Sequence, residues 1–390
     1  MRQAILNLEE SKIREVANAG IGRADVLPFW FGESDEVTPE PVRAAAIAAL
    51  QAGETFYSHN LGLPELRQAL ADYTSRLHAP AAIGPERIAV TSGGVNALML
   101  AMQMLIDAGD EVLAVTPVWP NLTAQPLILG ARLRCLALKP QADGAWTLDL
   151  PALLAAITPT TRLLVINSPN NPTGWTLSKA EQQAIVARCR ETGTWILADE
   201  VYERLYYRGD TTNGAAPSFL DVSGPNDRLV VVQSFSKAFL MTGWRLGYLV
   251  MPAKMTQPLG KLIEFNTSCA PVFVQRAAAV ALAQTDTITP RIVAHLRQCR
   301  DTLVPLLQAL PGVTTSAAPG GMYAFLRVNG FDDSLQLAKR LVLEAGVGLA
   351  PGAAFAPEAE GWLRWCFASK DLTRLEQGVQ RLRDWLAAQS

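Results

Sequence analysis

The chain has 390 residues, of which 49% are hydrophobic and 18% are charged, and this composition is typical of an ordinary globular protein. Its 34 Lys and Arg residues nearly balance its 36 Asp and Glu residues, so its charge indicates neither a nucleic-acid partner nor an anionic membrane partner. The five cysteines are scattered and form no C-x-x-C pair, which argues against a disulfide framework and against a metal site of the zinc type. We see no secretory signal and no uncharged run of the ~18 residues that a membrane span needs, so we expect a cytoplasmic protein.

Helical patterns come first along the chain. Residues 1–30 predict a short charged helix and a loop, residues 39–52 predict an alanine-rich helix closed by Gly53, and another helix begins near Pro64. From residue 88, short β-rich runs alternate with helical stretches. The runs are Ile88–Thr91, Glu111–Val115, Arg132–Leu138, Arg162–Asn167, Trp195–Asp199, Leu229–Gln233 and Leu246–Val250. This alternation predicts an α/β fold with a seven-stranded, mostly parallel sheet flanked by helices.

The pattern changes again towards the C-terminus. Residues 255–310 predict helices with an interruption at Asn266–Pro271. Beyond Pro311 and Gly312, strands at Gly321–Val328 and Leu363–Phe367 and helices at Ser334–Ala345 and Leu372–Ala388 predict a smaller α+β domain. We therefore divide the chain into an N-terminal arm with part of the small domain (1–45), a large α/β domain (46–285) and a small C-terminal α+β domain (286–390).

The most informative stretch is 229–248, LVVVQSFSKAFLMTGWRLGY. Its apolar strand ends in Ser234-Phe235-Ser236-Lys237, and Arg245 follows eight residues after the lysine. A lysine at the end of a buried strand is seldom buried unless it is paired or used chemically. A desolvated lysine beside another cation becomes a nucleophilic amine, so Lys237 is a candidate for a Schiff base, with the serines and Arg245 as a phosphate site. A surface lysine is the alternative.

Other predicted strands carry small or polar residues at their carboxyl ends, where sheets of this kind bind ligands. Gly93, Gly94 and Val95 precede a helical run, and free N–H groups there form either an anion site or only a turn. Trp119 either packs a loop or offers a flat face to an aromatic ring. Asn171 lies in an N-P-T-G string and could donate to a phenolate oxygen, although most such strings are turns.

Asp199 comes directly after the apolar run WILA. An unpaired carboxylate there would be costly, and a pyridinium nitrogen would remove that cost as its cationic partner. The alternative is an Asp that caps a following helix. Tyr202, three residues on, could reach the oxygen of the same ring.

The S-x-S-K string followed by R-x-G resembles the lysine motif of the class I/II aminotransferases, the fold-type I pyridoxal-phosphate enzymes of the aspartate aminotransferase superfamily. The resemblance runs from about Gly32 to the C-terminus. It implies that the large domain binds pyridoxal 5′-phosphate, that Lys237 forms the Schiff base and that Asp199 pairs with the pyridinium. Asn171 and Tyr202 then resemble the donors to the ring 3-oxygen, and Trp119 the aromatic residue stacked on the ring. The implied phosphate-binding residues are Gly93, Gly94, Val95, Ser234, Ser236 and Arg245.

Three further positions carry the resemblance. Tyr57 begins YSHNLGLPELR, which is similar to the family's Y…G…PELR segment. In the family this tyrosine reaches the cofactor phosphate of the neighbouring subunit, which implies a homodimer. Arg364 resembles the small-domain arginine that binds the substrate α-carboxylate, with a surface charge on an edge strand as the alternative. Gly32 resembles the pocket glycine whose backbone approaches the substrate.

The resemblance implies an aminotransferase (EC 2.6.1.-) of amino acid metabolism, whose substrates are amino acids and 2-oxo acids. It also implies ping-pong kinetics. The catalytic residues would be Lys237, Asp199 and Tyr202. Relatives in this family that are specific for dicarboxylic substrates place a second cation in the pocket. The segment that the resemblance implies for it, Phe265–Val274, contains no Arg or Lys, which favours neutral or aromatic amino donors. Trp30, Phe31, Tyr323 and Phe355 either line an apolar pocket or belong to the core.

Other functions stay open. A C–S lyase or another enzyme that modifies α-amino acids could use the same cofactor residues. A non-enzymatic sensor of the kind fused to transcription factors would carry an extra N-terminal DNA-binding domain. This alternative is disfavoured because the motifs begin near Gly32 and leave no room for such a domain. A nicotinamide-dependent enzyme is disfavoured because no G-x-G-x-x-G follows the first strand.

Overall fold

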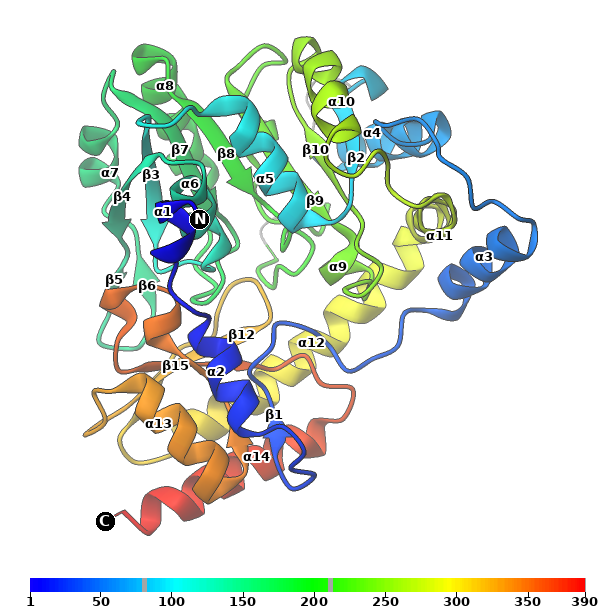
Figure 1. Ribbon diagram of the computed structural model, residues 1–390. Helices are drawn as coiled ribbons and strands as arrows, with labels where there is room; N and C mark the ends of the chain where they lie inside the picture. The colour runs from blue at the N-terminus through cyan, green and yellow to red at the C-terminus, as the bar shows by residue number, and fades with distance from the viewer. Residues whose placement is uncertain (79–82, 210–212, 390) are drawn as a thin grey trace.

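The computed structural model describes residues 1–78, 83–209 and 213–389. Figure 1 shows an upper lobe that contains the large sheet and a lower lobe that contains a small sheet. The helix α12 (Thr285–Gln308) runs from one lobe to the other. The N-terminal arm contacts both lobes, because α1 (Gln3–Leu6) touches α6 (Asn121–Ile128) whereas α2 (Lys12–Ala19) packs on the small lobe.

The large sheet has seven strands in the order β2-β10-β9-β8-β7-β3-β4. In chain order they are β2 (Ile88–Thr91), β3 (Glu111–Thr116), β4 (Arg132–Ala137), β7 (Thr161–Asn167), β8 (Trp195–Asp199), β9 (Leu229–Ser234) and β10 (Gly247–Val250). Only β10 runs antiparallel to its neighbours, so six strands share one direction. The predicted seven-stranded, mostly parallel sheet is confirmed, and each predicted strand corresponds to one of these.

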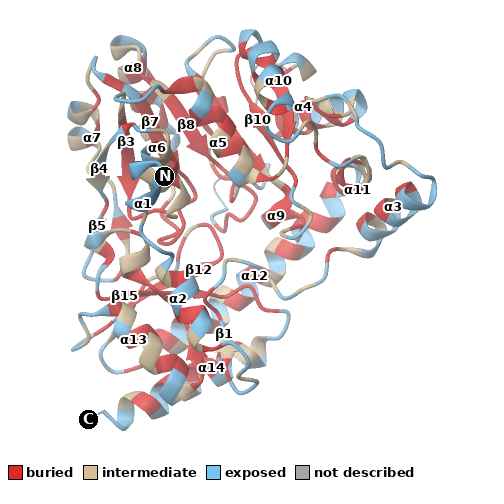
Figure 2. Cartoon of the chain, viewed as in Figure 1, coloured by how far each residue is buried: buried red, intermediate tan, exposed pale blue. Residues whose placement is uncertain are grey.

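Both faces of the large sheet are buried along every strand except the edge strand β4, which is largely exposed, as Figure 2 shows. On β9, for example, Val230 and Val232 pack on one face, and Leu229 and Val231 on the other. The first face is covered by α5 (Gly94–Leu105) and α10 (Thr256–Glu264), and the second by α4 (Pro64–His78) and α8 (Lys179–Thr192). This two-sided burial explains why the strands read as continuous apolar runs rather than as alternating ones.

The small lobe is built on a four-stranded antiparallel sheet. Its order is β11 (Val313–Thr315), β12 (Tyr323–Val328), β15 (Trp362–Cys366) and β14 (Ala350–Pro351). The helices α12, α13 (Ser334–Arg340) and α14 (Leu372–Ala387) complete this lobe, and α13 continues into a π-helical turn, Leu341–Ala345. The predicted smaller α+β domain is therefore present. Within the arm, β1 (Leu27–Pro28) pairs with β13 (Val347–Gly348), which joins part of the arm to this lobe.

The predicted domain boundaries remain predictions. One of them, at 45/46, lies inside α3 (Glu40–Gln51), which packs on α11 (Val272–Ala283). The other lies at the start of α12.

Several short elements carry too little pattern to be predicted from the sequence. The hairpin of β5 (Lys139–Pro140) and β6 (Trp146–Thr147) is one, and its Trp146 packs edge-on against Trp362 of the small lobe at 5.1 Å between ring centroids. The remaining elements are α7 (Leu150–Ala156), α9 (Phe235–Ala238) and the 3-10 turns Pro85–Arg87, Phe219–Asp221, Ala253–Met255, Gly352–Ala354 and Pro357–Ala359. No helix in the described part of the chain is long and apolar enough to cross a membrane.

Candidate active site

A cavity of about 470 Å³ lies where the carboxyl ends of the large-sheet strands meet β12 and β15 of the small lobe. Most of the predicted site residues line it. They are Gly32, Gly94, Val95, Trp119, Asn171, Asp199, Tyr202, Ser234, Ser236, Lys237, Arg245 and Arg364. Of the two that do not, Gly93 lies directly beside Arg245, whereas Tyr57 is 88% exposed on the surface.

Lys237 follows β9 on the short helix α9 and points into the cavity. Its Nζ donates a hydrogen bond of 2.6 Å to the carbonyl oxygen of Gly32. Burial lowers the pKa of Lys237 to about 8, and the guanidinium groups of Arg364 and Arg245 act in the same direction, against Cys366 and Glu33. Lys237 is therefore a half-buried amine at the cavity wall with a lowered pKa, and it is not a surface charge.

Asp199 ends β8 and is 2% exposed. Its side chain accepts a hydrogen bond only from the backbone N–H of Val201, at 3.3 Å, and among the described residues no cation lies within ion-pair distance. Burial raises the pKa of Asp199 to about 7. The residues that follow form turns and not a helix, so the carboxylate does not act as a helix cap. It is a buried acid that lacks a cationic partner.

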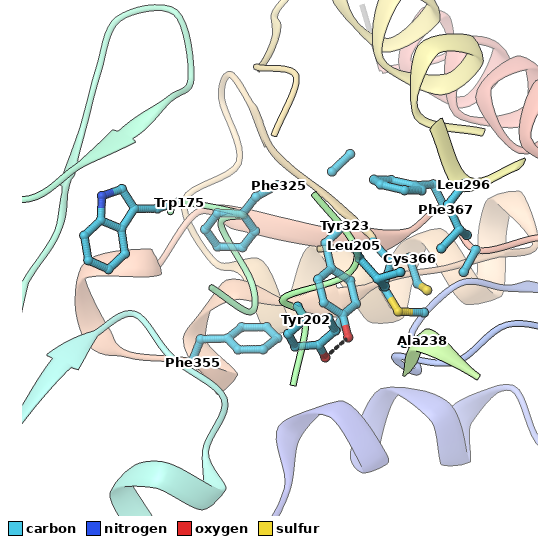
Figure 3. Packing of buried hydrophobic residues seen from close by; sticks show 14 of the residues in the cluster. Trp175, Tyr202, Leu205, Ala238, Leu296, Tyr323, Phe325, Phe355, Cys366 and Phe367 are labelled. Carbon is cyan, nitrogen blue, oxygen red and sulfur yellow. Dashed lines mark hydrogen bonds between the residues drawn. The ribbon is translucent and has the colours of Figure 1, made fainter. Parts of the chain in front are cut away.

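Tyr202, Tyr323 and Asn171 form a hydrogen-bonded group on one side of the cavity. The hydroxyl oxygens of Tyr202 and Tyr323 lie 2.7 Å apart, as Figure 3 shows, and the side-chain amide of Asn171 donates to the Tyr202 hydroxyl at 3.5 Å. Burial raises the pKa of Tyr202 well above its ordinary value, and that of Tyr323 to about 12. Both phenols are therefore neutral donors at physiological pH.

Arg364 lies on β15, an interior strand of the small sheet, and is 2% exposed, which excludes a surface charge on an edge strand. Its Nη1 donates to the side-chain oxygen of Asn171 at 2.9 Å, and its Nη2 donates to the carbonyl oxygen of Trp30. The guanidinium stacks between the rings of Tyr323 and Phe355, at 4.5 and 4.9 Å from their centroids. Among the described residues, its buried Nε has no hydrogen-bond partner. The arginine is held by two hydrogen bonds, which leave three of its five N–H groups unused.

Small residues and hydroxyl groups surround Arg245 at the start of α5. Gly93 adopts a φ of 95°, and a Cβ at this position would lie 2.5 Å from Arg245 Nη2. The hydroxyl of Ser234 donates to that of Ser236 at 2.9 Å. Free N–H groups of a helix start, two hydroxyls and a guanidinium together make a site for an anion such as phosphate.

Comparison with known proteins agrees with this geometry. Residues 25–382 match the family Aminotransferase class I and II. The aspartate aminotransferase of Thermotoga maritima is 33% identical to the chain over 93% of it and 92% of the relative. Aromatic-amino-acid aminotransferase 2 of Thermococcus litoralis is 30% identical over 95% and 94%. The solved structure of Thermus thermophilus aspartate aminotransferase with maleate superposes with a TM-score of 0.89 at 31% identity, covering 98% of this chain and 99% of that one.

The chain belongs to the class I and II aminotransferases. It is a pyridoxal-phosphate-dependent aminotransferase, and the resemblance noted in its sequence is confirmed.

The residues of this aminotransferase fit the cofactor. The carboxylate of Asp199, which has no ion-pair partner among the described residues, suits the pyridinium nitrogen, and the space beside Arg245 that a Cβ at Gly93 would fill suits the phosphate. Trp119 is half-buried at the cavity wall, where it can stack on a flat ring. The amine of Lys237 is available for the aldehyde.

Sequence reasoning missed several lining residues of the aminotransferase cavity. Ile13, Arg14, Glu33, Leu98, Asn167, Val201 and Thr242 are among them. Asn167 could have been found from its position at the end of a predicted strand, and it accepts a hydrogen bond of 2.7 Å from the backbone N–H of Asn171. Nothing in the local sequence marks Arg14. Of the four aromatic residues left open, Phe31 and Tyr323 line the cavity, whereas Trp30 and Phe355 are buried behind it.

Proposed function

We propose that this aminotransferase moves the α-amino group of a neutral or aromatic amino acid to a 2-oxo acid by a ping-pong mechanism that depends on Lys237. The observation that carries the proposal is the half-buried Lys237 amine, whose pKa is lowered to about 8, in the same cavity as the hydrogen-bonded guanidinium of Arg364. The relatives named above include aspartate and aromatic-amino-acid enzymes. In Phe265–Val274, the absence of Arg and Lys supports neutral or aromatic donors.

The cofactor supplies the electron sink that makes the Cα proton of the substrate acidic, and it carries the amino group between the two substrates. Lys237 would hold the cofactor at its aldehyde through Nζ, and this nitrogen would be a free amine once an amino acid is bound. It then acts as the base that removes the Cα proton, because a pKa near 8 leaves part of the amine neutral at physiological pH.

The remaining residues bind and orient. Asp199 would hold a proton on the ring nitrogen through an ion pair, while Asn171 and Tyr202 would donate to the ring oxygen. Arg364, aided by Asn171, binds the α-carboxylate in the bidentate geometry that a guanidinium favours. Gly93, Gly94, Val95, Ser234, Ser236 and Arg245 hold the phosphate. Gly32 permits a close approach, since a Cβ there would lie 2.1 Å from the Tyr323 hydroxyl.

The same proposal includes a homodimer in which Tyr57 reaches the partner's cofactor phosphate. Phe56, Tyr57 and Phe265 are between 83% and 90% exposed. Their two segments adjoin, because the backbone N–H of Ser58 donates to Cys269 Sγ at 3.5 Å. Exposed aromatic residues gathered in this way are typical of an interaction surface.

The test is a half-reaction screen on the purified holoenzyme. Single amino acids are added without an oxo acid, and the visible absorption of the bound cofactor is followed. Loss of this band with growth of pyridoxamine phosphate supports transamination, and the fastest donor identifies the substrate class. A persistent band with release of pyruvate or ammonia would instead indicate the lyase reaction.

A further inference from the structure

The cavity contains one cation that the proposed function does not use. Its charged lining residues are Arg14, Lys237, Arg245 and Arg364 on the positive side, and Glu33 and Asp199 on the negative side. Arg245 and Asp199 are assigned to the cofactor, Lys237 to its aldehyde and Arg364 to the α-carboxylate. Glu33 lies near Lys237 and accepts a hydrogen bond of 3.1 Å from the Thr242 hydroxyl. Arg14 is left over.

Arg14 projects from α2 and is exposed. Its guanidinium lies over the ring of Phe31, 5.7 Å from the centroid, and within the described residues it forms no ion pair and no side-chain hydrogen bond. A guanidinium stacked on an aromatic face keeps the N–H groups of its edge free, and this edge matches a carboxylate. Arg14 is therefore a cation at the cavity whose guanidinium packs on the ring of Phe31. Among the described residues it has no acidic partner.

Three consecutive residues place Arg14 relative to the reacting groups. The carbonyl oxygen of Trp30 accepts from Arg364, the ring of Phe31 supports Arg14, and the carbonyl oxygen of Gly32 accepts from Lys237. One short segment thus connects the candidate base, the candidate α-carboxylate site and the unassigned cation. A substrate held by Arg364 at one end has Arg14 available for a second carboxylate.

We propose that Arg14 is a specificity-determining residue that binds the side-chain carboxylate of a dicarboxylic substrate, either a 2-oxo dicarboxylic acid or the corresponding amino acid. The inference rests on the proposed aminotransferase function and names one of its two substrate classes. In the proposed reaction this substrate is the acceptor, a 2-oxo dicarboxylic acid that becomes the corresponding amino acid, and α2 of the arm supplies its cation while the donor remains neutral or aromatic. Because a ping-pong enzyme uses one cavity for both substrates, a neutral donor occupies the same space while Arg14 stays in contact with solvent.

The experiment compares the holoenzyme variants Arg14→Leu, Arg14→Lys and Lys12→Leu with the unsubstituted enzyme. Lys12 is the matched control, because it is a cation on the same helix that pairs with Glu9 at 2.6 Å outside the cavity. Two quantities are measured: the Kd of glutarate, a dicarboxylate that cannot react, by calorimetric titration, and the half-reaction kcat/KM with glutamate and with alanine.

We expect Arg14→Leu to weaken glutarate binding and to lower kcat/KM for glutamate by about 10- to 100-fold each, which is the usual effect of losing a charged hydrogen bond. For alanine, kcat/KM should stay within ~3-fold, because its side chain carries no charge for Arg14 to bind. Arg14→Lys should retain part of the binding, and Lys12→Leu should match the unsubstituted enzyme.

The inference is overturned if Arg14→Leu leaves glutarate binding unchanged, if glutamate and alanine lose kcat/KM by the same factor, or if the unsubstituted enzyme does not bind glutarate. Failure of the proposed function looks different: no amino acid then yields pyridoxamine phosphate. The glutarate titration still decides the role of Arg14 in that case, since it needs no turnover.

Discussion

Burial changes the ionisation of the two groups on which the proposed reaction depends. It lowers the pKa of Lys237 to about 8 and raises that of Asp199 to about 7. Each shift has the sign expected when a charged form loses its hydration. In the cofactor-free protein near neutral pH, Asp199 is therefore only partly ionised, and Lys237 is still mostly protonated but has a larger neutral fraction than an ordinary lysine. A bound pyridinium would restore the charge of Asp199.

The rate at which pyridoxal phosphate reconstitutes the cofactor-free protein should rise with pH and level off above about pH 8. The neutral amine is the nucleophile, and the Lys237 amine is protonated below its pKa of about 8 and neutral above it. Stopped-flow absorbance between pH 6 and pH 10 measures this rate. A rate that is still rising steeply at pH 10 would mean that Lys237 behaves as an ordinary exposed lysine.

Replacement of Lys237 by Ala should lower turnover by at least ~10³-fold, because it removes both the covalent anchor and the base. The cofactor should still bind without a covalent bond, since Asp199 and the residues around Arg245 are intact. Steady-state assays measure turnover, equilibrium titration measures cofactor binding, and borohydride trapping shows whether the covalent bond is lost. The exposed Lys254 provides a control, and Lys254→Ala should leave both unchanged. Near-normal transamination by Lys237→Ala would remove the lysine from the mechanism.

At the scale of elements, the turn between β2 and α5 determines the shape of the proposed phosphate site. Gly93 adopts its φ of 95° at the first residue before the helix, and Arg245 itself has a φ of 56°. Such conformations are costly for residues with a side chain, so they persist only where the surrounding structure requires them. Here they bring the guanidinium of Arg245 against a backbone that has no side chain.

Gly93→Ala should weaken pyridoxal-phosphate binding by about 10-fold or more, because the new Cβ displaces Arg245, a charged hydrogen-bond donor. Gly109→Ala is the matched control, since Gly109 has a φ of 89° but no atom lies within 4 Å of the position that its new methyl group would take. Both variants should lose about 1–2 kcal/mol of unfolding free energy from the strained backbone. Equal cofactor affinity in the two variants would contradict the assignment of Gly93.

For the whole molecule, the important arrangement is the meeting of the two lobes. Arg364 of the small sheet bonds to Asn171 at the edge of the large sheet, 193 positions away in the chain. The arm contributes Gly32, whose carbonyl accepts from Lys237. The cavity therefore exists only when the arm, the large lobe and the small lobe are packed together. The exposed aromatic surface of Phe56, Tyr57 and Phe265 is where we propose that a second copy of the chain binds.

Phe265→Glu should convert the proposed homodimer into monomers, because it places a charge in the exposed aromatic surface. Cofactor binding should weaken as well, because a monomer lacks the contact from the partner's Tyr57. Sedimentation velocity gives the oligomeric state, and equilibrium titration gives the affinity. Leu343→Glu is the control, an exposed apolar residue of the small lobe at 58% exposure. A dimer that survives Phe265→Glu would place the interface elsewhere, and an unsubstituted monomer would exclude the role of Tyr57.

The sequence alone was sufficient to predict the large sheet and to identify most of the polar residues at the carboxyl ends of its strands. A parallel sheet brings the carboxyl ends of its strands to one edge, so Asn171, Asp199 and Lys237 must lie near one another once their strands are recognised. Their chemistry follows from local facts: an amine, a carboxylate and an amide, each shortly beyond an apolar run. The short elements β5, β6 and β13 could not be predicted, since two residues carry no period.

Only the tertiary structure decided which distant residues join them. The side chains of Arg14 and Tyr323 reach the cavity from the arm and the small lobe, and no local pattern encodes how those parts dock. Arg364 was expected there only through the family resemblance. The pKa values of Lys237 and Asp199 likewise depend on burial by segments far away in the chain. Strand ends are specified by short-range patterns, whereas contacts between lobes are specified by packing that involves the whole chain.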